Sequence, residues 1–173
     1  LYALGIQFAS HRGTIDSARE AELREQLLRI PDDVTELLSG AEAIQQYAAR
    51  HFNSKSIFFI GRNIDYAIAL EGSLKLKEIS YIHSEAYASG ELKHGTISLI
   101  EEESLVVAIA CCPRLFLKTY SNMEQVVSRG AQVLLITNKS ELPETHGVTA
   151  LTLPLRETLF SPSLSVVILQ LFS

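Results

Sequence analysis

The sequence predicts an α/β domain of three layers, with a mainly parallel sheet between helices and with further helices in front of it. Short apolar runs, typical of buried strands, alternate with longer segments of helical periodicity. The first such run, residues 56–61, ends in Gly61 shortly before a long helical segment. Parallel strands need crossover connections of about a dozen residues, usually helices, so this alternation predicts helices on both faces of the sheet.

Four apolar runs are expected to be strands: 56–61, 104–111, 132–137 and 148–154. The last run alternates polar and apolar residues and contains Pro154, which favours an edge position. Three segments are expected to be the helices between and after the strands: 66–82, 115–129 and 162–172. Residues 84–95 fit no regular element, apart from a short helical turn at 90–95 between two glycines.

The first part of the chain is expected to be entirely helical. Residues 1–12 form a helix end closed by Gly13. Residues 14–39 are predicted to form two helices broken at Pro31, with Asp32 or Asp33 capping the second. Their charges are expected to form a solvated face, and a further helix follows at 41–52. We interpret residues 14–54 as a linker of packed helices.

Composition excludes several classes of protein. A chain of 173 residues with 47% hydrophobic residues can bury one sizeable core. The net charge of −5 and the scattered basic residues do not favour nucleic acid as a partner. No apolar run approaches the about 18 residues of a membrane span, and no signal peptide is recognisable, so a cytoplasmic location is expected. The adjacent Cys111 and Cys112 are interpreted as reduced core residues, and no metal site is predicted.

The functional prediction rests on three charged residues within 66–82. On a helix Glu71, Lys75 and Glu78 fall within an arc of roughly 60°, among aliphatic neighbours. One interpretation is an ordinary ion pair on a solvated face. The other is a partly buried carboxylate that is balanced by a cation, as a general base requires. The residues alone leave both open.

The turn between the first strand and this helix lies where sites form in parallel sheets, at the carboxyl ends of the strands. Its sequence, Gly61-Arg62-Asn63, is neither a dinucleotide-binding nor a P-loop motif. We expect a tight turn that needs one glycine, although a small anion at the helix start is physically possible.

Three pieces of the chain together resemble a known family. They are residues 61–63, residues 69–83 and residues 85–95, which ends Gly-Glu-Leu-Lys-His-Gly. In order and without a gap, they resemble the second sugar-isomerase (SIS) module of the glutamine:fructose-6-phosphate amidotransferases. The resemblance implies an SIS fold with a flavodoxin-like sheet at 55–173, truncated at its C-terminus. It also implies that residues 1–13 are the last helix of a preceding SIS module, so we expect a fragment of a longer polypeptide.

The resemblance also implies roles for four residues in making glucosamine 6-phosphate from fructose 6-phosphate and ammonia. Glu78 matches the residue that moves a proton between adjacent sugar carbons, Lys75 its helper near the sugar hydroxyls, and Glu71 the carboxylate that pairs with the lysine. His94 matches the ring-opening residue supplied to the neighbouring subunit, which implies a homodimer. Thr96 stands where the family usually has proline, which predicts a less rigid turn beside His94.

In the family, the phosphate-binding loop, the Schiff-base lysine and the glutaminase domain lie outside the segment matched here, so the fragment alone is expected to be inactive in synthesis. No cofactor is implied. Two other functions remain open: a non-catalytic SIS regulator that binds sugar phosphates, and an SIS deglycase. A regulator would not need the Glu71, Lys75 and Glu78 stripe.

Overall fold

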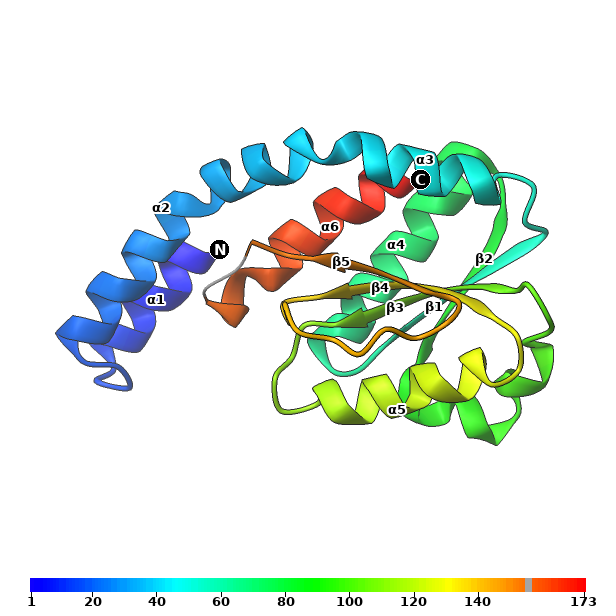
Figure 1. Ribbon diagram of the computed structural model, residues 1–173. Helices are drawn as coiled ribbons and strands as arrows, with labels where there is room; N and C mark the ends of the chain where they lie inside the picture. The colour runs from blue at the N-terminus through cyan, green and yellow to red at the C-terminus, as the bar shows by residue number, and fades with distance from the viewer. Residues whose placement is uncertain (155–156) are drawn as a thin grey trace.

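The computed structural model describes residues 1–154 and 157–173. At its centre lies a sheet of five parallel strands in the order β2-β1-β3-β4-β5 (Figure 1). The strands are β1 (Ser56–Gly61), β2 (His83–Ala88), β3 (Leu105–Ala110), β4 (Gln132–Thr137) and β5 (Val148–Thr152). The predicted parallel sheet is therefore confirmed, and β5 lies at an edge as its alternation indicated.

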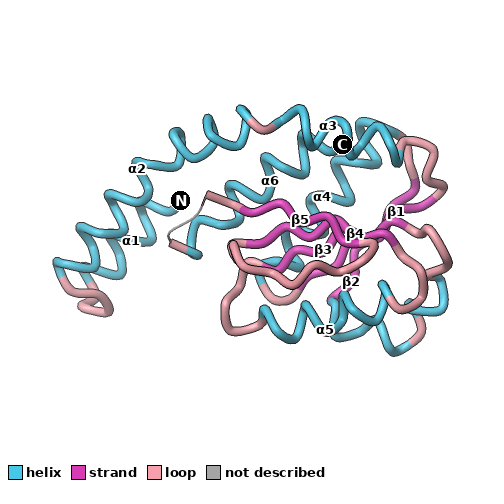
Figure 2. The backbone as a smooth tube through the Cα atoms, in the orientation of Figure 1, coloured by secondary structure: helices cyan, strands magenta, loops and turns pink. Residues whose placement is uncertain are grey.

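Helices cover both faces of the sheet, which confirms the prediction of three layers (Figures 1 and 2). One face carries α3 (Ala41–His51), α4 (Ile64–Ser80) and α6 (Ser161–Phe172). The other carries α5 (Phe116–Val127) and the 3-10 turns η1 (Ser89–His94) and η2 (Thr96–Leu99). Alternate side chains of the strands enter the two cores, as strand geometry requires: Phe59 lies in the α4 core and Ile60 in the α5 core.

The N-terminal helices differ from the prediction at Pro31. α1 (Tyr2–His11) packs against α2 (Ser17–Ser39), and the pair extends away from the sheet (Figure 1). α2 is one unbroken helix with Pro31 inside it, so Asp32 and Asp33 cap nothing, and Asp16 accepts the capping hydrogen bond instead.

Packing explains why α2 continues through Pro31. A proline in a helix interior costs about 3 kcal/mol, because it removes a hydrogen bond and crowds the preceding turn. Ile30, Val34 and Leu37, on both sides of the proline, pack against the core under α4 and α6. Burial of these side chains on the long helix offsets the local cost.

Residues 83–88 were not predicted as a strand, but they form β2 at the other edge of the sheet. The segment His-Ser-Glu-Ala-Tyr-Ala lacks the aliphatic residues that favour strands, and it is held by pairing with β1, from Ser56 opposite His83 to Gly61 opposite Ala88. The helical turn predicted just after it is confirmed as η1. The remaining short turn, η3 (Thr158–Phe160), leads into α6.

α4 lies unusually close to α6 and to the sheet at Gly72. A Cβ added to Gly72 would stand 2.8 Å from Leu169 Cδ1 and 3.0 Å from Phe59 Cε1. The first distance is shorter than real Cβ atoms show, so with a larger residue the Leu169 side chain or α4 itself must shift. The glycine therefore sets the position of the helix that carries Glu71, Lys75 and Glu78.

Gly72→Ala should lower the free energy of unfolding by about 1–3 kcal/mol, because overpacking outweighs the gain in helix propensity. The matched control is Gly5→Ala in α1, where nothing lies within 4 Å of the added Cβ. This control should stabilise by up to about 1 kcal/mol. Urea unfolding of both variants measures the difference, and a Gly72→Ala protein as stable as its parent would contradict the close packing.

Candidate functional site

Glu71, Lys75 and Glu78 lie together on α4, as their spacing predicted. Lys75 Nζ is 2.7 Å from Glu78 Oε2 and 3.9 Å from Glu71 Oε1, so the ammonium group stands between the two carboxylates. The hydrogen bond to Glu78 is the main cause that raises the pKa of Lys75. The lysine is therefore a fixed cation at neutral pH, and Glu78 is the carboxylate that it contacts directly.

Of the two interpretations left open by the spacing, the structure favours charges on an open face of α4, since their aliphatic neighbours do not enclose them. The side chains of Glu71, Lys75 and Glu78 are 41%, 29% and 51% exposed. Their aliphatic neighbours are open too, since Leu74 is 44% and Ile79 55% exposed. The side of α4 that enters the core is instead the one with Ala69, Gly72, Ser73 and Leu76. None of five pockets identified among the described residues includes the three charged residues.

The turn between β1 and α4 confirms the expected need for one glycine. A Cβ on Gly61 would lie 2.4 Å from the backbone oxygen of Asp65, so only glycine lets α4 start so close to the strand. Two residues later, Asn63 has φ 55° and ψ −123°, a conformation normally left to glycine. The helix start is thus held in a strained geometry by its surroundings.

Asp65 is a buried acid that the sequence analysis did not single out. It is 2% exposed, and its Oδ2 accepts hydrogen bonds from the backbone N–H groups of Cys111 and Cys112, both at 3.0 Å. Burial raises the pKa of Asp65 to about 6, although the two N–H groups act in the opposite direction. The only signal in the sequence was an acid in the first turn of a helix that follows a buried strand.

Cys111 is a core residue, as expected, whereas Cys112 is partly exposed, and both are free. Burial raises the pKa of Cys111 to about 12, with the nearby Asp65 charge as a further cause. The thiol is therefore protonated near neutral pH and is not a nucleophile.

His94 lies on the opposite side of the sheet from the three charges of α4. It is exposed at the end of η1, and Leu92 of the same turn is buried in the core under α5. α4 belongs to the core on the other face. The structure therefore unites Glu71, Lys75 and Glu78 but does not bring His94 to them within one chain.

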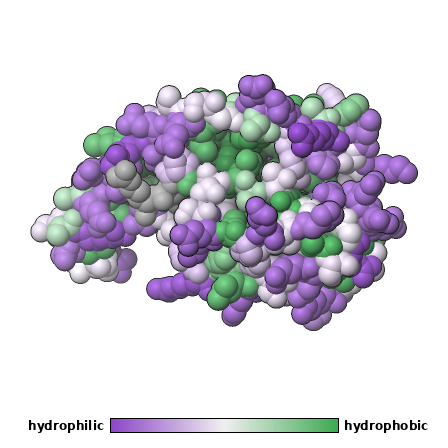
Figure 3. All heavy atoms as spheres, viewed as in Figure 1, coloured by the Kyte–Doolittle hydropathy of each residue, from purple (hydrophilic) through white to green (hydrophobic). Residues whose placement is uncertain are grey.

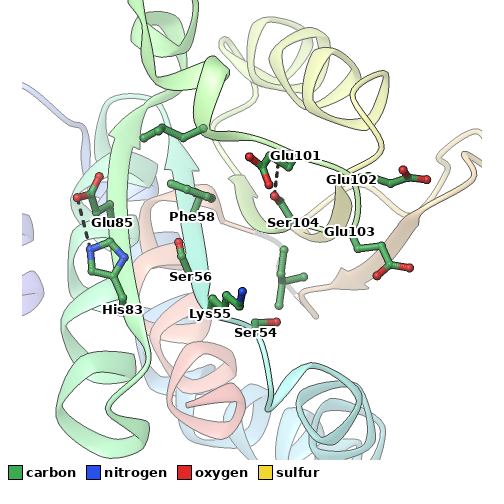
Figure 4. A pocket seen from close by; sticks show the side chains of 12 residues that line it. Ser54, Lys55, Ser56, Phe58, His83, Glu85, Glu101, Glu102, Glu103 and Ser104 are labelled. Atoms are coloured by element: carbon green, nitrogen blue, oxygen red, sulfur yellow. Dashed lines mark hydrogen bonds and ion pairs between the residues drawn. The ribbon is translucent and has the colours of Figure 1, made fainter.

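A cavity of about 670 Å³ lies elsewhere, at the amino ends of β1, β2 and β3 (Figure 4). Its charged lining residues are Lys55, His83, Glu85, Glu101, Glu102 and Glu103. His83 Nε2 stands 3.6 Å from Glu85 Oε1. Because sites in parallel sheets form at the carboxyl ends of the strands, this cavity is at the wrong edge for the predicted chemistry.

A second hollow, of about 480 Å³, opens between α2, α3 and β5, and hydrophobic residues gather there in Figure 3. Leu37, Ile44, Leu151 and Leu153 are among its apolar lining residues. Over residues 1–154 and 157–173, no cluster of three or more His, Cys, Asp or Glu side chains could hold a metal ion. The helices in these same ranges include none that is both long and apolar enough to span a bilayer.

Comparison with known proteins places this arrangement in a family. The model of the SIS domain matches residues 52–173. The chain belongs to the SIS domain family. The match begins at the end of α3 and includes the whole sheet, α4 and η1.

The sequence of this SIS domain is similar to proteins named glutamine–fructose-6-phosphate aminotransferase (isomerizing). Those from Caldanaerobacter subterraneus and Clostridium tetani are each 46% identical to it, over 175 and 174 residues. Each match covers the whole chain but only 29% of the relative. The chain thus spans less than a third of these curated proteins.

Solved structures give the same picture. The C-terminal domain of glucosamine-fructose-6-phosphate aminotransferase from Francisella tularensis superposes with a TM-score of 0.90 at 34% identity, over 96% of this chain and 47% of that one. Glucosamine-6-phosphate deaminase from Thermotoga maritima, at 19% identity and a TM-score of 0.59, shares the fold alone.

Asp65 should make stability depend on pH between about 4 and 6. Its pKa rises from 3.8 in the unfolded chain to about 6 in the folded one, so the folded state binds this proton more tightly. The resulting stabilisation is complete below pH 4 and is lost as pH rises to 6, at most about 3 kcal/mol. Asp65→Asn keeps an oxygen acceptor for the two N–H groups, but its side chain does not titrate in this pH range.

Urea unfolding at pH 4, 5, 6 and 7 should show the parent losing stability relative to Asp65→Asn as pH rises. Asp65→Ala, which removes the acceptor of the Cys111 and Cys112 N–H groups, should be less stable than Asp65→Asn at every pH. A constant difference between the parent and Asp65→Asn across this range would contradict the raised pKa.

Proposed function

We propose that the chain is the second SIS module of an enzyme that converts fructose 6-phosphate and ammonia to glucosamine 6-phosphate. The observation that carries the proposal is the trio of Glu71, Lys75 and Glu78 on one face of α4, with the ammonium group between two carboxylates. The identity of 46% to proteins named for this activity supports it. A module that only bound sugar phosphates would have no use for an acid–base group of this kind.

In this proposal Glu78 is the base that moves a proton between adjacent sugar carbons. A general base must be ionised and must reach its proton. Glu78 is placed for this role, because its carboxylate lies 2.7 Å from the ammonium group of Lys75 and its half-exposed side chain is open to a ligand. Glu71, 3.9 Å from the same ammonium group, helps to hold Lys75 in place while its remaining donors reach sugar hydroxyls.

Water can be excluded from such a reaction only if another surface packs over the open face of α4. We propose that the sugar phosphate binds between this face and another module, which would also hold the phosphate group. The exposed Leu74 and Ile79 beside the charges support a contact there. The relatives offer room for the module, since the chain covers 29% of the matched sequences and 47% of the Francisella structure. The isolated fragment would then be inactive in synthesis.

The proposal assigns His94 to ring opening in the site of a neighbouring subunit. Its support is position, because His94 is exposed on the face of the sheet opposite the trio of its own chain. A homodimer could bring the two faces together. A cytoplasmic location and a glutaminase domain that supplies ammonia in the full-length protein belong to the same proposal.

Glu78→Gln in the full-length protein should lower glucosamine 6-phosphate formation by about 10²- to 10⁴-fold, because the amide cannot accept the proton. Glutamine hydrolysis should be largely unchanged. The matched control is Glu124→Gln on the exposed face of α5, which should keep both activities. Near-parental sugar product from Glu78→Gln would remove this residue from proton transfer, and a deglycase would show sugar-amine cleavage in place of synthesis.

A mixture of subunits tests the role of His94. His94→Ala and Glu78→Gln should each be nearly inactive alone. In the mixed dimer one site would combine Glu78 of the first subunit with His94 of the second, so random mixing should restore about a quarter of the parental activity. A different affinity tag on each variant, with purification on both tags in succession, confirms that the subunits have exchanged. Fully exchanged dimers without activity would argue against a shared site.

A further inference from the structure

The turn that carries His94 is anchored at its base and free at its rim. η1 follows β2 directly, with Ser89 and Leu92 completely buried. Leu92 packs in the same core as Ile60 and Met123. Glu91, Lys93 and His94 are exposed on the other side of the turn. The place of His94 is therefore decided by whatever holds the buried side of η1.

Arg62 is the charged residue at that buried side. A Cβ added to Gly90 would lie 2.8 Å from Arg62 Nη2 and 3.0 Å from Nη1, so the guanidinium group lies flat against the backbone of the turn. Arg62 Nη2 also donates a hydrogen bond of 3.0 Å to Asn122 Oδ1 on α5, and Asn122 is 6% exposed. One side chain thus joins the end of β1, the turn η1 and helix α5.

The surroundings of Arg62 are unusual for a guanidinium group. Among residues 1–154 and 157–173, no carboxylate lies within 4.0 Å of it. Its Nε is buried and donates no hydrogen bond there. A partly buried cation without a carboxylate adds little to stability. Its shape explains its presence better, because a planar guanidinium fills the narrow space over a glycine as lysine cannot.

We infer that Arg62 is a positioning residue for His94, acting through Gly90 and η1. The inference rests on the proposed function, in which His94 touches the substrate. η1 is only six residues long and includes both Gly90 and His94, so a shift at Gly90 displaces His94 four residues later. Displacement of a catalytic group by about 1 Å can cost about 10²-fold in rate. Arg62 contributes geometry and contacts neither the substrate nor the trio on α4.

Arg62→Lys in the full-length protein should lower kcat for glucosamine 6-phosphate about 10- to 100-fold with KM little changed, because the phosphate and sugar contacts remain. Gly90→Ala, which forces the guanidinium group away, should act in the same direction. The control is Arg129→Lys, which makes the same exchange at an exposed arginine of this layer, bonded to the Ile100 carbonyl and away from Gly90. The control should keep the parental kcat.

A double-mutant cycle separates positioning from general damage. If Arg62 acts only through His94, Arg62→Lys should cost 10-fold or more in the parent but less than about 2-fold in the His94→Ala background. Mixed dimers give the same answer where His94→Ala is too slow to measure. Arg62→Lys should recover activity with Glu78→Gln subunits and recover none with His94→Ala subunits.

The possible outcomes test the role of Arg62 separately from the proposed role of His94 in synthesis. If His94→Ala has no effect on synthesis, the role of His94 is refuted and the inference with it. Suppose instead that His94→Ala is impaired. The inference about Arg62 alone is then overturned by any of three results: Arg62→Lys keeps the parental kcat, the losses in kcat of the two variants multiply in the double variant, or mixed dimers of Arg62→Lys with Glu78→Gln recover no activity.

Discussion

The carboxylate of Asp65 ties together the two loops on which the candidate site depends. It stands in the first turn of α4 and accepts the backbone N–H groups of Cys111 and Cys112 at the end of β3. Gly61 allows the tight turn before Asp65, and Gly72 lets the following turns of α4 pack closely against α6. Together with the Asp65 hydrogen bonds, they fix where α4 begins and how far it lies from the sheet. These contacts fix the position of Glu71, Lys75 and Glu78, because the ion pairs between those three residues are half exposed.

The contacts that stabilise the fold are different from the residues that we propose act on the substrate. Exposed ion pairs such as Lys75 with Glu78 add little to folding, because water screens their charges. The buried bonds of Asp65 and the packing at Gly72 contribute more per contact. The trio is thus free to exchange its partners for a ligand at small cost to the fold, which suits a group that must transfer a proton.

The sheet also divides the proposed chemistry between its two faces. α4 presents the acid–base trio on one side, and η1 presents His94 on the other. In this proposal a single copy of the domain completes a site only with other surfaces, and each face needs its own support. Asp65 and Gly72 serve the first, whereas Leu92 and Arg62 lie beneath the second.

The sequence by itself determined the strand–helix alternation, the edge position of β5, the glycine turn at Gly61 and the grouping of Glu71, Lys75 and Glu78. These features follow from local periodicity and sterics, which residue spacing records directly. Tertiary structure alone decided the rest. Pro31 stays inside α2 because distant side chains pack on both sides of it, and residues 83–88 become a strand because β1 offers them a partner. Exposure of the trio, and the separation of His94 from it, likewise depend on which face of the sheet each element covers, and spacing along the chain carries no record of that choice.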